Sequence, residues 1–174
     1  MADVLLCTDD GTITGSAERE EAHAGKGKLH RAFSVFVFRR NGTELLIQRR
    51  SDKKTLFPLL WANTCCSHLR KGEETATAGQ QRLKEELGVE CALTEGASFV
   101  YRAEDPQGKG SEYEYDTILT GDLTQDQEVK PDPDEVAGWK WVTLTKLGDD
   151  IAANPKQFAP WFLLGLAMIL RSKK

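Results

Sequence analysis

Short apolar runs mark the first strands that the sequence predicts. From Ala32 to Phe38 nearly every residue is apolar or aromatic, a pattern typical of a strand that is buried on both faces. Asn41-Gly42 is a hairpin turn signal, and residues 44–48 form the predicted return strand. We expect a basic loop over residues 49–54 to follow this hairpin.

Two helices are predicted from apolar spacing and end signals. Residues 73–87 place apolar side chains at helical intervals, and Gly88 ends the helix. The inner face of this helix is expected to consist of Ala76, Ala78, Leu83 and Leu87. Pro160 suits the first turn of a second helix, which carries the long apolar run of residues 161–170. A membrane span needs about 20 apolar residues, so this run predicts a buried core helix.

Three further strands are expected later in the chain, over residues 98–102, 113–120 and 139–142. Residues 1–31 are polar and charged, and no element is predicted there. Together the elements indicate an α+β fold with a mixed, antiparallel-rich sheet and helices packed on it. The length predicts a single domain, residues 1–174, and we hypothesise that its N-terminal segment, residues 1–28, is mobile.

Composition narrows the class of protein. With 27 acidic and 23 basic residues the formal net charge is −4, so the chain as a whole lacks the excess of positive charge that is typical of nucleic-acid-binding proteins. Hydrophobic residues at 40% exclude a disordered chain. Cys65 and Cys66 are adjacent, which disfavours an unstrained disulfide, and no secretory signal is recognised. We expect a cytoplasmic monomer with reduced thiols that binds neither nucleic acid nor a membrane.

The segment from Trp61 to His68 carries the first candidate chemistry. Cys66 and His68 are two residues apart, so a thiol and an imidazole share one side of an extended chain. A cysteine can exchange a proton near neutral pH when its surroundings favour it. Residue type also fits two other interpretations, cysteines that only pack in the core and a zinc half-site at Cys65 and His68.

Glu112 and Glu114 are the second candidate pair. Residues two apart in a strand share one face, so the two carboxylates converge there. Paired carboxylates bind metals or perform acid–base chemistry. A solvated edge strand would show the same pattern.

The predicted helix over residues 73–87 resembles the sequence box of the Nudix family, in which Gly, Glu and Arg-Glu-x-x-Glu-Glu-x-Gly build a metal site. Glu73 and the segment 85–89 fit this box, whereas Gln81-Arg82 replaces the Arg-Glu pair and Ser67 replaces the leading glycine. The resemblance implies a Nudix-like α/β/α sandwich. A cation in place of a metal-binding carboxylate implies weaker divalent binding at the hydrolytic site and a phosphate contact at Arg82.

Several motifs in order resemble the type 1 isopentenyl-diphosphate isomerases of the Nudix superfamily. The degenerate box lies between the Cys66 segment and the Glu112 pair, and the likeness runs from about Leu29 to Trp161. It includes Leu29-His-Arg-Ala-Phe-Ser34, Arg49-Arg50, Tyr101-Arg-Ala-x-Asp-Pro106 and Phe158-Ala-Pro-Trp161. In isoprenoid biosynthesis the family interconverts isopentenyl and dimethylallyl diphosphate, adding a proton to one face of an alkene and removing another from the opposite face.

The resemblance implies roles for the reacting groups. Cys66 and Glu114 would be the opposed proton carriers, with Tyr101 beside them. The face of Trp161 would stabilise a tertiary carbocation, although residue type alone suggests core packing. A divalent metal, Mn²⁺ or Zn²⁺, would be held by His23, His30, His68, Glu112 and Glu114.

The resemblance also implies a site for a small diphosphate substrate. Mg²⁺ would join the diphosphate to Glu86 and to the backbone carbonyl of Cys66. The phosphate oxygens would contact Arg19, Arg50, Lys54, Arg82 and the amide of Ser67. Leu69 stands where the family usually has proline.

Two alternatives stay open on the sequence. A Nudix hydrolase of nucleoside diphosphate derivatives would share the fold, although Gln81-Arg82 speaks against it. A Nudix-like binding module without catalysis would require Cys66, Glu114 and the three histidines to be incidental.

Overall fold

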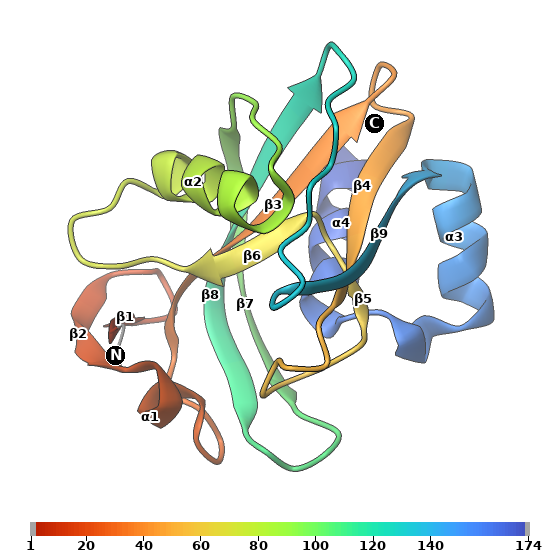
Figure 1. Cartoon of the computed structure of the whole chain (residues 1–174). Helices are drawn as coiled ribbons and strands as arrows, with labels where there is room; N and C mark the ends of the chain where they lie inside the picture. Colours follow the sequence, from red (N-terminus) through yellow and green to blue (C-terminus); the bar gives the residue numbers. More distant parts are fainter. Residues whose placement is uncertain (1–2, 173–174) are drawn as a thin grey trace.

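A computed structural model of the chain describes residues 3–172, so residues 1–2 and 173–174 of the predicted domain lie outside the described part. Nine strands form one sheet, and helices cover both of its faces (Figure 1). The elements in chain order are β1 (Asp3–Cys7), β2 (Ile13–Glu18), α1 (Arg19–His23), β3 (His30–Arg39), β4 (Glu44–Arg50), β5 (Trp61–Ala62), β6 (Cys65–His68), α2 (Thr75–Leu87), β7 (Thr94–Glu104), β8 (Ser111–Leu123), β9 (Val136–Thr143), α3 (Leu144–Ala153), a 3₁₀ turn (Pro155–Gln157) and α4 (Pro160–Ser172).

Strand β3 is the centre of the sheet. It pairs in parallel with β8 and antiparallel with β1, β4 and β6. The remaining strand pairs of the described chain are antiparallel, which confirms the predicted mixed, antiparallel-rich sheet.

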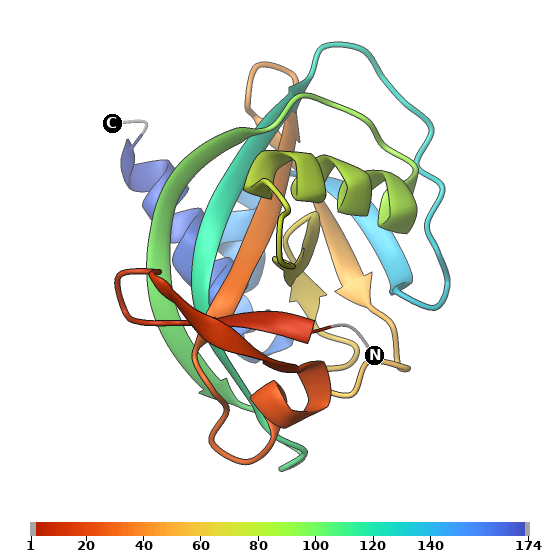
Figure 2. The same cartoon turned by 90° about the vertical axis from the view of Figure 1, so that its left-hand side faces the viewer.

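The alternation of side chains along β3 creates two cores. Phe36 and Phe38 pack with α3 and α4 on one face, whereas Phe33, Val35 and Val37 pack with α2 on the other. Figure 2 shows α2 and α4 on opposite sides of the strands, so the predicted α/β/α sandwich is confirmed. Within residues 3–172, no helix is long and apolar enough to cross a membrane.

The predicted elements from residue 32 onward are confirmed, with shifted ends. Two expectations were wrong. Arg49 and Arg50 do not lie in a basic loop, because β4 continues through Arg50, whose N–H donates to the carbonyl of Leu60 at 2.9 Å. No element was predicted before residue 32, whereas β1, β2 and α1 lie within residues 3–23. The mobility of residues 1–28 stays a prediction. Strand β2 is almost entirely exposed and α1 has five residues, so neither produces a strong apolar pattern.

Helix α2 approaches the sheet through a glycine that the sequence analysis did not single out. Ala76 and Ala78 are only half-buried, whereas Gly79 is fully buried beside Leu83 and Leu87. A Cβ atom at Gly79 would lie 2.4 Å from Cδ1 of Leu119. The absence of a side chain at this position therefore sets the distance between α2 and β8.

We expect Gly79→Ala to destabilise the fold by about 1–3 kcal/mol, because the added methyl group overpacks a closed core. Gly148 in α3 is the matched control, since a Cβ atom there meets nothing within 4 Å. Gly148→Ala should stabilise by about 0.5–1 kcal/mol through helix propensity. Chemical denaturation measures both, and equal stabilities of the two variants would contradict close packing at Gly79.

Candidate active site and metal centre

Five side chains from four elements converge at one end of the sheet. His23 ends α1, His30 begins β3, His68 ends β6, and Glu112 and Glu114 lie on β8. One ligand atom of each side chain lies within 4.8 Å of the others, and the imidazole centroids are 4.8–4.9 Å apart. The structure therefore brings together all five residues predicted for the Mn²⁺ or Zn²⁺ site.

The outer nitrogens of two histidines are fixed by backbone carbonyls. Nδ1 of His23 lies 2.6 Å from the carbonyl oxygen of Arg19, and Nδ1 of His30 lies 2.7 Å from that of Lys28. A carbonyl only accepts, so each Nδ1 carries a hydrogen and Nε2 of each ring faces the centre of the cluster, where the neutral form of the ring would present a lone pair to a cation.

Several buried atoms at the centre of this cluster have no hydrogen bond. Nε2 of His23 lies 2.9 Å from Oε2 of Glu112, but neither atom, nor Nε2 of His30, makes an aligned hydrogen bond. Buried polar atoms are nearly always hydrogen-bonded, so three such atoms without a partner in one cluster call for a ligand. Imidazole and carboxylate donors together fit a divalent metal.

Glu114 connects this cluster to the cavity. Its Oε1 lies 3.1 Å from Nε2 of His68, and its Oε2 accepts a 2.5 Å hydrogen bond from the hydroxyl of Tyr101. Burial opposes ionisation of Glu114, but contacts with His30 and His68 outweigh it and hold its pKa well below the usual range. Burial raises the pKa of Tyr101 well above its ordinary value. Strand β8 lies between β3 and β7, so the edge-strand alternative is wrong.

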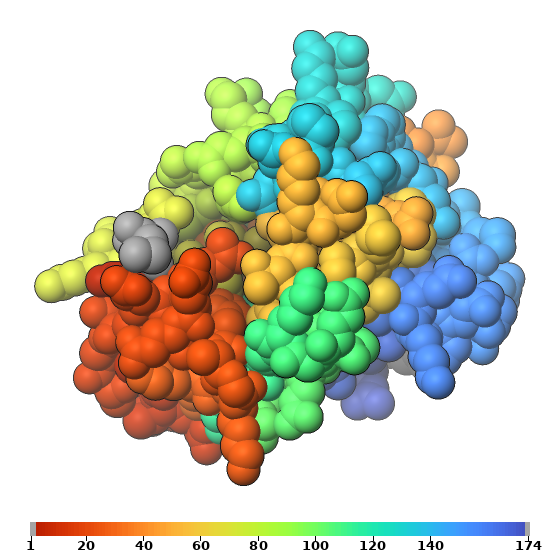
Figure 3. All heavy atoms as spheres, turned by 60° about the horizontal axis from the view of Figure 1, so that its bottom comes forward, coloured from red at the N-terminus to blue at the C-terminus, as the bar shows by residue number. Residues whose placement is uncertain are grey.

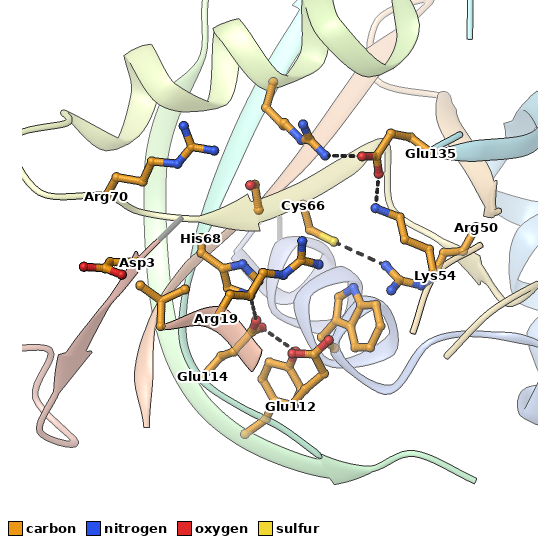
Figure 4. A pocket seen from close by; sticks show the side chains of 15 residues that line it. Asp3, Arg19, Arg50, Lys54, Cys66, His68, Arg70, Glu112, Glu114 and Glu135 are labelled. Carbon is orange, nitrogen blue, oxygen red and sulfur yellow. Dashed lines mark hydrogen bonds and ion pairs between the residues drawn. The ribbon is translucent and has the colours of Figure 1, made fainter. Parts of the chain in front are cut away.

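The two adjacent cysteines point to opposite faces of the sheet. Cys65 is buried in the core under α2, which removes it from a zinc half-site with His68. Cys66 faces the cavity, and its Sγ lies 3.9 Å from Nη1 of Arg50 (Figure 4). Burial raises the pKa of Cys66 to about 12, so the neutral thiol prevails at pH 7. Residue type suggested a thiol that can exchange a proton, and burial holds the resting form of this thiol protonated.

Aromatic rings form the apolar wall beside Cys66. Trp161 is buried, and its Nε1–H donates to Oδ1 of Asn63 at 3.2 Å, which fixes the indole. The ring of Tyr101 lies 6.1 Å away and that of Phe57 lies 5.4 Å away. The guanidinium of Arg50 lies 5.1 Å from the indole centroid and donates to two carbonyls of the 56–57 turn.

A cationic half of the site lies between α2 and the loop after β4. Nε of Arg82 lies 2.7 Å from Oε1 of Glu86, which is 2% exposed. The second oxygen of Glu86 accepts a 2.9 Å hydrogen bond from Gln48. Lys54 and Arg82 both pair with Glu135. Burial lowers the pKa of Lys54, because desolvation disfavours the charged ammonium group. Nearby anions favour the charged form of this side chain.

One cavity of about 170 Å³ joins the two halves. Its lining includes these predicted residues: Arg19, Arg50, Lys54, Cys66, Ser67, His68, Arg82, Tyr101, Glu112, Glu114 and Trp161. His23 lines an adjoining groove, while His30 and Glu86 are buried behind the wall. Figure 3 shows the N-terminal segment in red, the loop after β4 in amber and the β7–β8 turn in green side by side around this groove.

Comparisons with known proteins show the family to which the chain belongs. The NUDIX domain profile matches residues 28–162. The isopentenyl-diphosphate Delta-isomerase of Halorhodospira halophila is 43% identical over 162 residues, which cover 93% of this chain and 91% of that protein. The protein of the same name from Nocardia farcinica is 46% identical over 158 residues, covering 91% and 89%. The chain belongs to the isopentenyl-diphosphate Delta-isomerase family. This membership confirms the resemblance and the enzyme class expected from the sequence.

Solved structures agree on the fold. The protein DR0079 of Deinococcus radiodurans is 25% identical, with a TM-score of 0.64 over 87% of this chain and 89% of that chain. The MutT protein of Methanosarcina mazei is 15% identical, with a TM-score of 0.66 over 84% of this chain and 96% of that chain. Both comparisons support the Nudix fold.

The sequence analysis missed several residues that hold the site in place. Asn63 lies inside the segment from Trp61 to His68 but was assigned no role there. Gln48 and Glu135 belong to no sequence motif that would have indicated a role. Leu69, which stands in place of the family's usual proline, donates its N–H to the carbonyl of Arg31 at 3.2 Å. A proline could not make this bond, so Leu69 extends the pairing of β6 with β3 next to His68.

Metal binding should be measurable directly. We expect the purified protein to bind one equivalent of Zn²⁺ or Mn²⁺ at the five-residue cluster and to melt at a higher temperature with the metal than after chelation. His30→Ala should abolish both effects, because it removes a buried ligand. Glu85→Gln, which changes an exposed carboxylate on α2, is the control. Equal metal content in His30→Ala, measured by elemental analysis, would place the metal elsewhere.

The raised pKa of Cys66 predicts a pH dependence. The thiolate is the reactive form, so alkylation of Cys66 by iodoacetamide should be slow at pH 8 and still increasing at pH 10. Mass spectrometry of the Cys65–Cys66 peptide from metal-free protein, with glutathione as an internal standard, measures the rate. A profile that levels off near pH 9 would show that the burial seen here does not control this thiol.

Proposed function

We propose that this protein interconverts isopentenyl diphosphate and dimethylallyl diphosphate for isoprenoid biosynthesis. The supporting observation is the placement of Cys66 and Glu114. They come from β6 and β8, which flank β3 on either side, and both line the same cavity. An isomerisation that adds one proton and removes another needs two such groups.

The protonation states of the two groups complement each other. Cys66 holds a proton at neutral pH, while Glu114 is ionised and accepts a hydrogen bond from Tyr101. In one direction of the reaction, a proton is added to the terminal alkene carbon, which leaves a cation on the branched carbon. A second proton then leaves the adjacent methylene carbon, which lies between the branched carbon and the carbon that bears the diphosphate oxygen. The roles of the two groups exchange in the reverse direction.

The aromatic wall suits a carbocation intermediate. The faces of Trp161 and Tyr101 offer π-electron density without a nucleophilic atom that would trap a tertiary cation. The hydrogen bond from Trp161 to Asn63 fixes the indole in position. This wall also limits access of water, which would convert the cation to an alcohol.

We assign the Mn²⁺ or Zn²⁺ ion to one half of the cavity and the diphosphate with its Mg²⁺ to the other half. His23, His30, His68, Glu112 and Glu114 would hold Mn²⁺ or Zn²⁺, whose positive charge would maintain Glu114 as a carboxylate. Glu86 and the carbonyl of Cys66 would hold Mg²⁺ together with the diphosphate. The phosphate oxygens would be bound by Arg19, Arg50, Lys54, Arg82 and the amide of Ser67. The cytoplasmic location and the monomeric state stay predictions of the sequence.

Isomerisation in D₂O tests the reaction. Incubation with isopentenyl diphosphate and Mg²⁺, after loading of the His/Glu cluster, should give dimethylallyl diphosphate and deuterium in both compounds. Mass spectrometry and NMR measure both outcomes. Phosphate release from a panel of nucleoside diphosphate derivatives, without isomerisation, would favour a hydrolase instead.

Cys66→Ala and Glu114→Gln should each reduce kcat by at least about 10²–10⁴-fold, the usual contribution of a proton-transfer group. Cys65→Ala is the matched control, because Cys65 lies in the opposite core and its loss affects packing only. Glu114→Gln should also lower metal content, whereas Cys66→Ala should not. A Cys65→Ala variant as inactive as Cys66→Ala would mean that the wrong thiol was assigned.

A further inference from the structure

Glu135 forms ion pairs with two cationic side chains of the proposed diphosphate site at the same time. Its Oε1 lies 2.8 Å from Nη2 of Arg82, and its Oε2 pairs with the ammonium of Lys54 (Figure 4). Both carboxylate oxygens are therefore engaged by side chains that the cavity presents to a ligand. The side chains of Lys54 and Glu135 are only 16% and 24% exposed, so solvent screens this contact less than a surface ion pair.

The main chain of Glu135 is held firmly while its carboxylate extends into the cavity. The N–H of Ser51 donates to the carbonyl of Glu135 at 2.9 Å, and the N–H of Glu135 donates to the carbonyl of Asp132 at 3.1 Å. Strand β9 starts at the next residue, Val136. Rotation of the side chain is thus the simplest way for this carboxylate to leave the two cations.

We propose that Glu135 is an internal anion that competes with the diphosphate for Lys54 and Arg82 and thereby limits how tightly substrate and product are held. The proposal rests on the diphosphate site proposed above. A phosphate group that binds these cations must replace the carboxylate, so the observed affinity is the difference between two sets of charge-assisted contacts. Because substrate and product carry the same diphosphate, the competition favours release of both.

A competing anion and a positioning residue predict opposite effects of mutation. If Glu135 only oriented Lys54 and Arg82, its removal would weaken diphosphate binding. If it competes, removal frees two cations and strengthens binding. Arg82 keeps a second carboxylate partner, Glu86, when Glu135 is lost, so its side chain stays directed toward the site.

Glu135→Gln tests the proposal, since it removes the charge and keeps the shape. Calorimetric titration with pyrophosphate and Mg²⁺ should show a Kd about three- to tenfold lower than that of the unchanged protein, the scale of one partly screened ion pair. The KM for isopentenyl diphosphate and the inhibition constant of dimethylallyl diphosphate should fall by similar factors, with kcat unchanged or reduced. Glu135→Ala provides a second test if the glutamine amide still binds the cations.

Asp134→Asn is the matched control. Asp134 is the preceding residue and pairs with Lys53 outside the cavity, with both side chains about two-thirds exposed. It changes net charge by the same amount, so its pyrophosphate affinity should stay within about twofold of the original, as expected for a screened surface pair.

A higher or unchanged Kd in both Glu135 variants, with unaltered melting temperatures, would overturn the competition. Equal tightening in Asp134→Asn would replace it with a general charge effect. Pyrophosphate binding does not depend on turnover. A protein that binds pyrophosphate but does not isomerise the substrate would therefore sink the proposed function alone, whereas failure of the unchanged protein to bind pyrophosphate would remove the premise of both.

Discussion

The parallel pairing of β3 with β8 is the constraint on which the site depends. Its register places His30 opposite Glu114 and continues through ten residue pairs to Arg39 and Leu123. Side chains alternate between the faces of a strand, so a shift of one residue would turn Glu112 and Glu114 toward the core under α2. The same shift would remove Leu119 from the core under α2 and Ile118 from the core against α4. Apolar packing on both faces of the sheet therefore fixes the register that assembles the metal ligands.

Arg82 stands where the Nudix box has a glutamate, and this difference changes which ligands α2 can bind. A carboxylate there would add to Glu86 and favour a cluster of divalent cations. Arg82 instead contacts Glu86 on its own helix and Glu135 on the segment before β9. The helix therefore presents the cation of Arg82 to the cavity, with the carboxylate of Glu86 buried directly behind it. This arrangement suits the proposed binding of a diphosphate together with a single metal.

Much of the site could be predicted because its chemistry is encoded locally. The period of two in Glu112 and Glu114, the spacing of Cys66 and His68, and the motif order were sufficient to choose the family. Burial was not predictable, because it depends on contacts between distant segments. Arg50 appeared to belong to a basic loop, yet it is 8% exposed, being covered by the 56–57 turn and Trp161. His23 ends the five-residue helix α1, which follows the exposed strand β2, so only the family resemblance placed that histidine in the site.

The acidic residues of β8 show how the neighbouring strand influences the pKa of each carboxyl group. Glu112, Glu114 and Asp116 follow one another at every second position of one face, a continuation that the sequence analysis overlooked. His30 lies opposite Glu114, whereas Ala32 lies opposite Asp116. Burial and the charge of Glu114 raise the pKa of Asp116 well above its usual value, although the hydroxyl of Ser34 donates to it at 2.7 Å. Two buried carboxylates two residues apart cannot both ionise cheaply. Contacts with the imidazoles therefore lower the pKa of Glu114, the carboxylate that faces the cavity, while the pKa of Asp116 behind it is raised.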